Sequence, residues 1–98
     1  MKRLRLDTAA KGELLHETKY YKALRPETGA KFRVAVDQAF DRIKRAPPSG
    51  KPDEEHCRRM RIEGFPFSVV YREEALEIVV YAIRPDAKEP GYWLHRAG

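Results

Sequence analysis

The first residues of the chain alternate between charged and apolar side chains. Residues 2–6, KRLRL, place Leu4 and Leu6 on one face of an extended segment and Arg3 and Arg5 on the other, because successive side chains of a strand point to opposite faces. The alternation predicts a short N-terminal strand with one face turned toward a core.

Two helical patterns follow this strand. Asp7 and Thr8 supply N-cap oxygens before AAKGELLHETKYYKAL, and apolar residues recur there at helical spacing, so we expect a helix over about residues 8–24. RPETG, residues 25–29, is expected to break the chain, since Arg25 precedes a proline and Gly29 closes the segment.

The next segment, AKFRVAVDQAFDRIKRA at residues 30–46, has the strongest helical pattern of the chain. Its apolar side chains fall on one face: Phe32, Val36, Ala39, Phe40 and Ile43. Two helices joined by a short loop are expected to lie antiparallel.

The second half of the chain predicts strands. PPSGKPDEE, residues 47–55, is polar and rich in turn residues, and we expect a flexible loop there. Beyond it, Glu63-Gly64 and Glu73-Glu74 separate three β-type segments, HCRRMRI, FPFSVVYR and ALEIVVYAI, which predict an antiparallel three-strand meander. The order strand, helix, helix and three strands predicts a single α+β domain over residues 1–98, with both helices packed on one face of a twisted sheet.

The same period of two predicts a basic outer face for this sheet. Five arginines are expected to converge on the face that the helices leave uncovered: Arg3, Arg5, Arg59, Arg61 and Arg72. Arg84 follows at the end of the last strand. Guanidinium groups bind phosphates and carboxylates through charge-assisted, often bidentate hydrogen bonds. The pattern is equally typical of an antiparallel sheet that turns one polar face to water, so the alternation leaves both interpretations open.

Composition and charge narrow the classes of protein. The 98 residues carry 20 Lys and Arg against 15 Asp and Glu, a net charge of +5, which favours polyanionic or acidic partners. No apolar run approaches the roughly 20 residues of a membrane span, and no signal peptide is visible, so we expect a soluble, cytoplasmic protein. Cys57 is the only cysteine; it has no disulfide partner and no zinc-ligand spacing, and we expect no metal and no cofactor.

Candidates for proton transfer gather near the C-terminus. The ending EPGYWLHRAG contains Tyr92, His95 and Arg96, with Lys88 shortly before them. We expect these side chains at the rim of the basic face, where cleavage of a phosphodiester would need a proton donor and a proton acceptor. Trp93 is instead expected to pack against the sheet as part of the core.

Other polar residues are weaker candidates. The pairs Glu13/Glu17 and Asp37/Asp41 are typical of solvated helix faces. Cys57 shares a predicted face with the arginine pair of its own strand, which would lower the pKa of its thiol, but no His or Asn partner is evident.

Four segments together resemble one family. YYKALRPETGAKF, RRMRIEGFPFSVVYR, EIVVYAI and the closing PGYW occur in the order and spacing of the RelE/ParE superfamily of toxins from bacterial type II toxin-antitoxin modules. The resemblance implies a small α+β toxin that a cognate antitoxin binds and inactivates, in a toxin-antitoxin hetero-oligomer. One branch of the superfamily cleaves mRNA in the ribosomal A site, and the other poisons DNA gyrase without known cleavage.

The ribonuclease branch supplies expectations for individual residues. Its basic pair on the second strand falls on Arg59 and Arg61, its basic residue after the last strand falls near Lys88, and its C-terminal aromatic residue falls on Tyr92. The resemblance thus implies that these four bind and distort the scissile phosphate, without a metal. Ser68 departs from this branch, which has an arginine at that position of the hairpin.

A second departure lies after the last strand. Many relatives that end in PGYW have a histidine where this chain reads Arg84-Pro85-Asp86, and FPFSVVYR with PGYW resembles the ParE-type side of the superfamily more closely. Three hypotheses therefore stay open: a ribosome-dependent endoribonuclease, a non-enzymatic toxin that binds gyrase, and a basic binding module or decayed toxin that retains only antitoxin binding.

Overall fold

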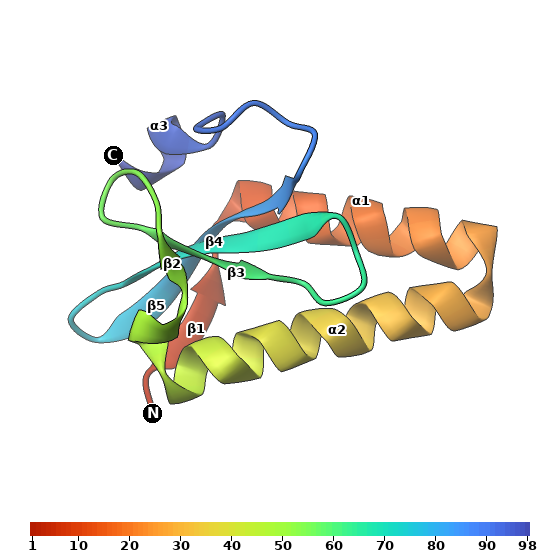
Figure 1. The fold of residues 1–98 in the computed structure, drawn as a ribbon, viewed down its shortest axis with the longest axis horizontal. Helices are drawn as coiled ribbons and strands as arrows, with labels where there is room; N and C mark the ends of the chain where they lie inside the picture. The colour runs from red at the N-terminus through yellow and green to blue at the C-terminus, as the bar shows by residue number, and fades with distance from the viewer.

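The computed structural model describes all residues from Met1 to Gly98 and has the α+β architecture expected from the sequence. Its elements, in chain order, are β1 (Arg3–Leu6), α1 (Thr8–Leu24), α2 (Pro26–Arg45), the 3₁₀ turn η1 (Pro47–Ser49), β2 (Lys51–Pro52), β3 (Arg58–Arg61), β4 (Phe67–Glu73), β5 (Glu77–Pro85) and α3 (Leu94–Ala97). Figure 1 shows α1 and α2 running side by side in opposite directions, with α3 well away from α2. None of the helices is both long and apolar enough to span a membrane.

The strands form one sheet in the order β1-β5-β4-β3-β2. β3, β4 and β5 pair antiparallel, which confirms the predicted meander, and β1 pairs parallel with β5. The ladder between β4 and β5 shifts between Val70 and Tyr71, as at a β-bulge, and such a shift bends a strand and increases its twist. In this order β5 lies inside the sheet, with β1 on one side and β4 on the other.

The two long helices differ in how closely the sequence predicted their limits. α1 runs over Thr8–Leu24 as expected, and the Asp7 carboxylate caps it by accepting a hydrogen bond from the Ala9 amide at 3.0 Å. The predicted break over residues 25–29 is wrong: only Arg25 is non-helical, and α2 begins at Pro26. Proline is well tolerated at the first position of a helix, and the residue before it is held extended.

Gly29 serves the contact between α1 and α2 rather than a turn. It is buried inside α2, and a Cβ at this position would lie 2.8 Å from the Lys22 Cα atom of α1. The helices can therefore approach each other closely because the residue has no side chain.

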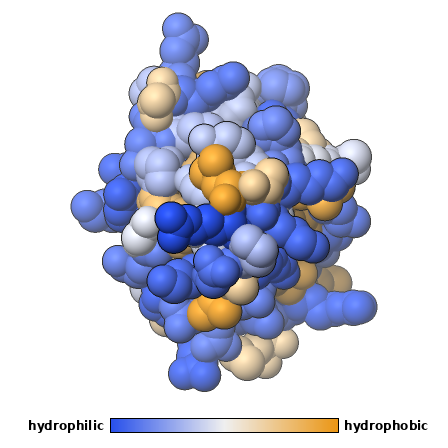
Figure 2. All heavy atoms as spheres, turned by 90° about the vertical axis from the view of Figure 1, so that its right-hand side faces the viewer, coloured by the Kyte–Doolittle hydropathy of each residue, from blue (hydrophilic) through white to orange (hydrophobic).

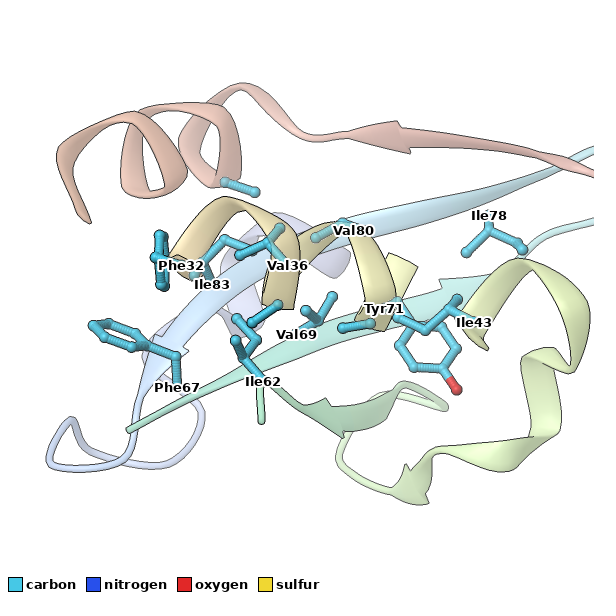
Figure 3. Packing of buried hydrophobic residues seen from close by; sticks show 13 residues of the cluster. Phe32, Val36, Ile43, Ile62, Phe67, Val69, Tyr71, Ile78, Val80 and Ile83 are labelled. Carbon is cyan, nitrogen blue, oxygen red and sulfur yellow. The ribbon is translucent and has the colours of Figure 1, made fainter. Parts of the chain in front are cut away.

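The main core lies between the sheet and these two helices. Phe32, Val36 and Ile43 of α2 are fully buried and pack with side chains of the inner sheet face such as Val69 and Ile83 (Figure 3). Burying an aliphatic or aromatic side chain of this size contributes about 1.5–3 kcal/mol. This cluster confirms the prediction that both helices cover one face of the sheet.

The opposite face of the sheet has a second, smaller core, which the alternation of the strands does not predict. Trp93 and Ala97, from the C-terminal segment, pack there against Val70, Val79 and Ala82. Trp93 is completely buried, as predicted, but the expectation of an uncovered outer face is wrong over this region. Val70, Val79 and Ala82 are apolar on the side that the helices leave free, so burial under the tail removes them from water.

Candidate functional site

A cationic groove crosses one end of the sheet and is lined by residues of β2, β3, β4 and β5. It encloses about 350 Å³, and seven of its lining residues have polar side chains: Ser49, Lys51, Arg59, Arg61, Ser68, Arg84 and Asp86. We call this site the cationic groove below. Its four cations outnumber its single carboxylate, so it would attract an anionic group.

The strand register explains why these residues meet. Arg61 of β3 pairs with Ser68 of β4, and Ser68 pairs with Arg84 of β5. Residues paired across antiparallel strands point to the same face with Cβ atoms about 4.5–5.5 Å apart. The two arginines therefore flank a small residue on one level of the sheet, and Ser68, only 6% exposed, leaves space between them.

The four cations of the groove differ in whether a nearby carboxylate neutralises them. Arg61 Nη1 lies 3.0 Å from Asp86 Oδ2, whereas Arg59 Nη1 donates to the Pro52 carbonyl at 3.0 Å and has Asp53 only at 3.8 Å. The Lys51 and Arg84 side chains make no hydrogen bond or ion pair within the chain. Part of the positive charge is thus available to a ligand.

Lys51 is the groove residue that sequence reasoning missed. Residues 47–55 were expected to form a flexible loop, but Lys51 and Pro52 form β2 and pair with Arg59 and Arg58 of β3. A two-residue strand leaves no period in the sequence, so only the pairing itself identifies it. The loop prediction is wrong for this part of the segment.

A second polar cluster joins the C-terminal segment to α1 through Glu13. The Tyr92 hydroxyl donates to Glu13 Oε2 at 2.7 Å, and the Ile83 amide donates to Glu13 Oε1 at 3.0 Å. Arg96 forms a fork, with Nη1 3.0 Å from Oε1 and Nη2 3.2 Å from Oε2. Glu13 is therefore a structural acceptor, and the expectation that it belongs to a solvated helix face is wrong.

The protonation of Tyr92 follows from this cluster. Burial of the phenol, together with its hydrogen bond to the Glu13 carboxylate, raises the pKa of Tyr92 above its ordinary value, because both effects disfavour the phenolate. The Tyr92 hydroxyl thus keeps its proton and donates a hydrogen bond to the Glu13 carboxylate. The Tyr92 side chain does not line the cationic groove.

The four residues that the resemblance assigned to phosphate chemistry fall into two places. Arg59 and Arg61 line the cationic groove, whereas Lys88 and Tyr92 line a separate hollow of about 430 Å³ beside Glu13. Lys88 Nζ lies 5.5 Å from the centroid of the Tyr92 ring. The structure therefore does not bring the four into one pocket.

The remaining predicted arginines are also dispersed. Arg3 and Arg5 lie on β1, which β5 and β4 separate from β3, and Arg5 is held by Glu77 through hydrogen bonds of 3.1 and 3.0 Å. Arg72 donates to Glu74 at 2.6 Å and to the Tyr81 hydroxyl at 3.1 Å. The predicted convergence of five arginines is wrong, because the C-terminal segment occupies the middle of this face.

Three further residues with a predicted role lie outside the cationic groove. His95 is exposed on α3, while Arg96 is bound to Glu13 and to the Tyr81 carbonyl at 3.0 Å. Cys57 is only 2% exposed, and burial raises the pKa of its thiol to about 11 despite the nearby Arg72 guanidinium. The expectation of a lowered thiol pKa is therefore wrong.

Comparisons with known proteins agree with this architecture. The sequence matches a family model described as the ParE toxin of the type II toxin-antitoxin system parDE over residues 4–90. Among solved structures, it is similar to a chain of the "Chromosomal ParDE TA system from P. aeruginosa", with a TM-score of 0.73 and 21% sequence identity over 87% of this chain and 96% of that chain. At this identity the likeness concerns the fold. A comparison with curated protein sequences gave no match.

Proposed function

The chain belongs to the ParE toxin family of type II toxin-antitoxin systems, and from this premise we propose that it inhibits growth by binding DNA gyrase in the cytoplasm. The cationic groove is the surface that meets the target. A cognate antitoxin neutralises the toxin in a hetero-oligomer.

The hydrogen bond between Tyr92 and Glu13 is the observation that favours binding of a target over cleavage of a phosphodiester. Cleavage of a phosphodiester requires one group that takes a proton from the nucleophile and another that gives a proton to the leaving oxygen. The Tyr92 hydroxyl, the phenolic candidate, donates to Glu13 at 2.7 Å in the hollow beside α1. The groove itself offers four cations and Asp86, whose carboxylate is paired with Arg61 at 3.0 Å. Such a site can hold an anion, but it lacks a matched acid and base.

The alternative function is ribosome-dependent cleavage of mRNA, with Arg59, Arg61, Lys88 and Tyr92 acting together. One observation favours it: Arg59, Arg61 and Arg84 line one groove, and several guanidinium groups can stabilise the charge that develops on a phosphate. Under this alternative, Lys88 and Tyr92 would have to move from the hollow to the groove when the toxin meets the ribosome.

The positive charge of the groove would also favour binding of the antitoxin. An acidic segment of the antitoxin would cover these cations, and opposite charges speed the encounter of two proteins. Raising the salt concentration should therefore slow association, because exposed charges are screened.

Supercoiling of relaxed plasmid by purified gyrase tests the proposed target. The wild-type toxin should inhibit supercoiling, and the antitoxin should reverse the inhibition. Arg61→Ala should weaken inhibition by roughly tenfold or more, since charge-assisted hydrogen bonds to a ligand contribute about 1.5–3 kcal/mol. Arg3→Ala is the matched control, because Arg3 is exposed on β1 outside the groove. Normal supercoiling at toxin concentrations that arrest growth would remove gyrase as the target.

A further inference from the structure

The pairing of β2 with β3 brings two cations together. Lys51 pairs directly with Arg59 across the two strands, so their side chains point to the same face, and both line the cationic groove. Like charges directly opposite in a sheet repel each other. The folded chain nevertheless holds Lys51 in this position without an internal anionic partner.

Tyr71, a residue of the main core, holds the segment that precedes Lys51. The Tyr71 ring is fully buried, and Figure 3 shows its hydroxyl oxygen pointing toward the chain that leads from α2 to β2. The hydroxyl donates to the Pro47 carbonyl at 2.6 Å and accepts from the Gly50 amide at 2.9 Å. One side chain thus holds the first residue of η1 and also Gly50, the residue directly before Lys51.

Two features next to this contact restrict the same segment. Arg58 Nη1 donates to the Gly50 carbonyl at 2.9 Å, so both polar groups of the Gly50 backbone are engaged. Gly50 is buried, and a Cβ there would overlap the Tyr71 hydroxyl and ring. These contacts hold Gly50 in place, and with it the backbone from which the Lys51 side chain extends to the groove.

At the target, phosphate fits the lining of the groove better than a protein segment does. Met60 is its only hydrophobic lining residue among nine, whereas protein interfaces depend on buried aromatic and aliphatic anchors. Interfaces with nucleic acids are more polar and strongly positive, and arginine forks match the geometry of phosphate oxygens.

We propose that Lys51 is a further anion-binding residue of the cationic groove, that Tyr71 is its positioning residue, and that their ligand is a phosphodiester segment of a nucleic acid. This inference deepens the proposed function and rests on it in one respect: the groove is the surface that meets gyrase, and the phosphodiester would be that of the DNA on which gyrase acts.

Binding of a short fluorescein-labelled DNA strand to the full-length toxin, measured by fluorescence anisotropy, tests the role of Lys51. Lys51→Ala should weaken binding by roughly threefold to tenfold at low salt and reduce the slope of log K against log salt by about 1. Lys51→Arg should retain binding, because it keeps the charge. Lys19→Ala removes the same charge from an exposed position on α1 and should leave binding unchanged. Equal effects of Lys51→Ala and Lys19→Ala would overturn the proposal.

A double-mutant cycle tests the positioning role of Tyr71. Tyr71→Phe removes the hydroxyl that holds η1 and should weaken DNA binding as much as Lys51→Ala does, whereas in the Lys51→Ala background it should have no further effect. A general loss of structure would add to the effect of Lys51→Ala instead, and that result would contradict the assignment. Tyr20→Phe is the control, since Tyr20 is 53% exposed and makes no hydrogen bond through its hydroxyl.

Binding measurements with a DNA strand, an RNA strand and an acidic peptide distinguish phosphodiester groups from protein carboxylates as the ligand. A DNA strand and an RNA strand of the same length should both show the Lys51-dependent change, because they share the phosphodiester. Lys51-dependent binding to an acidic peptide and to neither nucleic acid would overturn the phosphate assignment. Since these measurements contain no gyrase, the failure of gyrase inhibition would remove the proposed target alone, and the failure of DNA and RNA binding would remove this inference alone.

Discussion

The Tyr92 hydroxyl and the Glu13 carboxylate are joined by a hydrogen bond of 2.7 Å, although 79 residues separate them in sequence. Arg96 adds a forked ion pair to the same carboxylate. Through these contacts α1 fixes the C-terminal segment, which in turn places Trp93 over the outer face of the sheet. Tyr92, which the sequence suggests as a proton donor, thus takes part in the contact that holds the C-terminal segment against α1.

Replacing Glu13 with Gln should destabilise the toxin. The change removes the charge that Arg96 requires, at a site where the Glu13 and Arg96 side chains are only 23% and 13% exposed. We expect the free energy of unfolding in urea to fall by about 2 kcal/mol. Glu17→Gln, on the same helix and beside the same hollow, should change it by less than about 0.5 kcal/mol. Equal stability of the two variants would show that the Glu13 cluster does not hold the tail.

Two glycines should respond to alanine in opposite directions. Gly50→Ala should lower the free energy of unfolding by about 1–3 kcal/mol, because the added Cβ overlaps the buried Tyr71 ring. Gly12→Ala should raise it by about 0.5–1 kcal/mol, since a Cβ at this position of α1 meets no atom within 4 Å and alanine favours the helix. Thermal unfolding followed by circular dichroism measures both effects, and a stable Gly50→Ala variant would contradict the described contact.

The Cys57 thiol should react slowly in the folded toxin. Burial raises its pKa to about 11, so at pH 8 nearly all of it is the unreactive thiol, and the thiolate appears only as the pH approaches 11. In the urea-unfolded chain the pKa returns to about 8.5 and labelling should be fast. Alkylation with iodoacetamide across this pH range measures the difference. Equally fast labelling of the folded and unfolded chains at pH 8 would contradict the burial of Cys57.

The sequence predicted the regular elements better than their connections. The helix over residues 8–24 and the antiparallel meander follow from local periods, and the structure confirms them. In the sequence, Pro26 and Gly29 favour a break between the helices, but α2 begins at Pro26. In the structure Pro26 occupies the first helical position, where its missing amide proton is not needed, and Gly29 allows the helices to approach closely.

The sequence predicted only part of the site, because only some of its residues are placed by strand alternation. Arg59 and Arg61 could be found from strand alternation, and they do line the groove. Lys51 could not, since it lies on a two-residue strand that leaves no period in the sequence. The role of Glu13 was also hidden, because a carboxylate on a helix gives no sign that the end of the chain will return to it.

The central claim is that the toxin acts by binding gyrase through the cationic groove and not by cleaving RNA with Tyr92. Gyrase supercoiling and mRNA cleavage on translating ribosomes, measured with the same preparations of wild-type, Arg61→Ala and Tyr92→Phe toxin, test it most directly. The account predicts that the wild-type and Tyr92→Phe toxins inhibit supercoiling, that Arg61→Ala inhibits weakly, and that none of the three cleaves mRNA. Unimpaired supercoiling together with mRNA cleavage that Tyr92→Phe abolishes would contradict it.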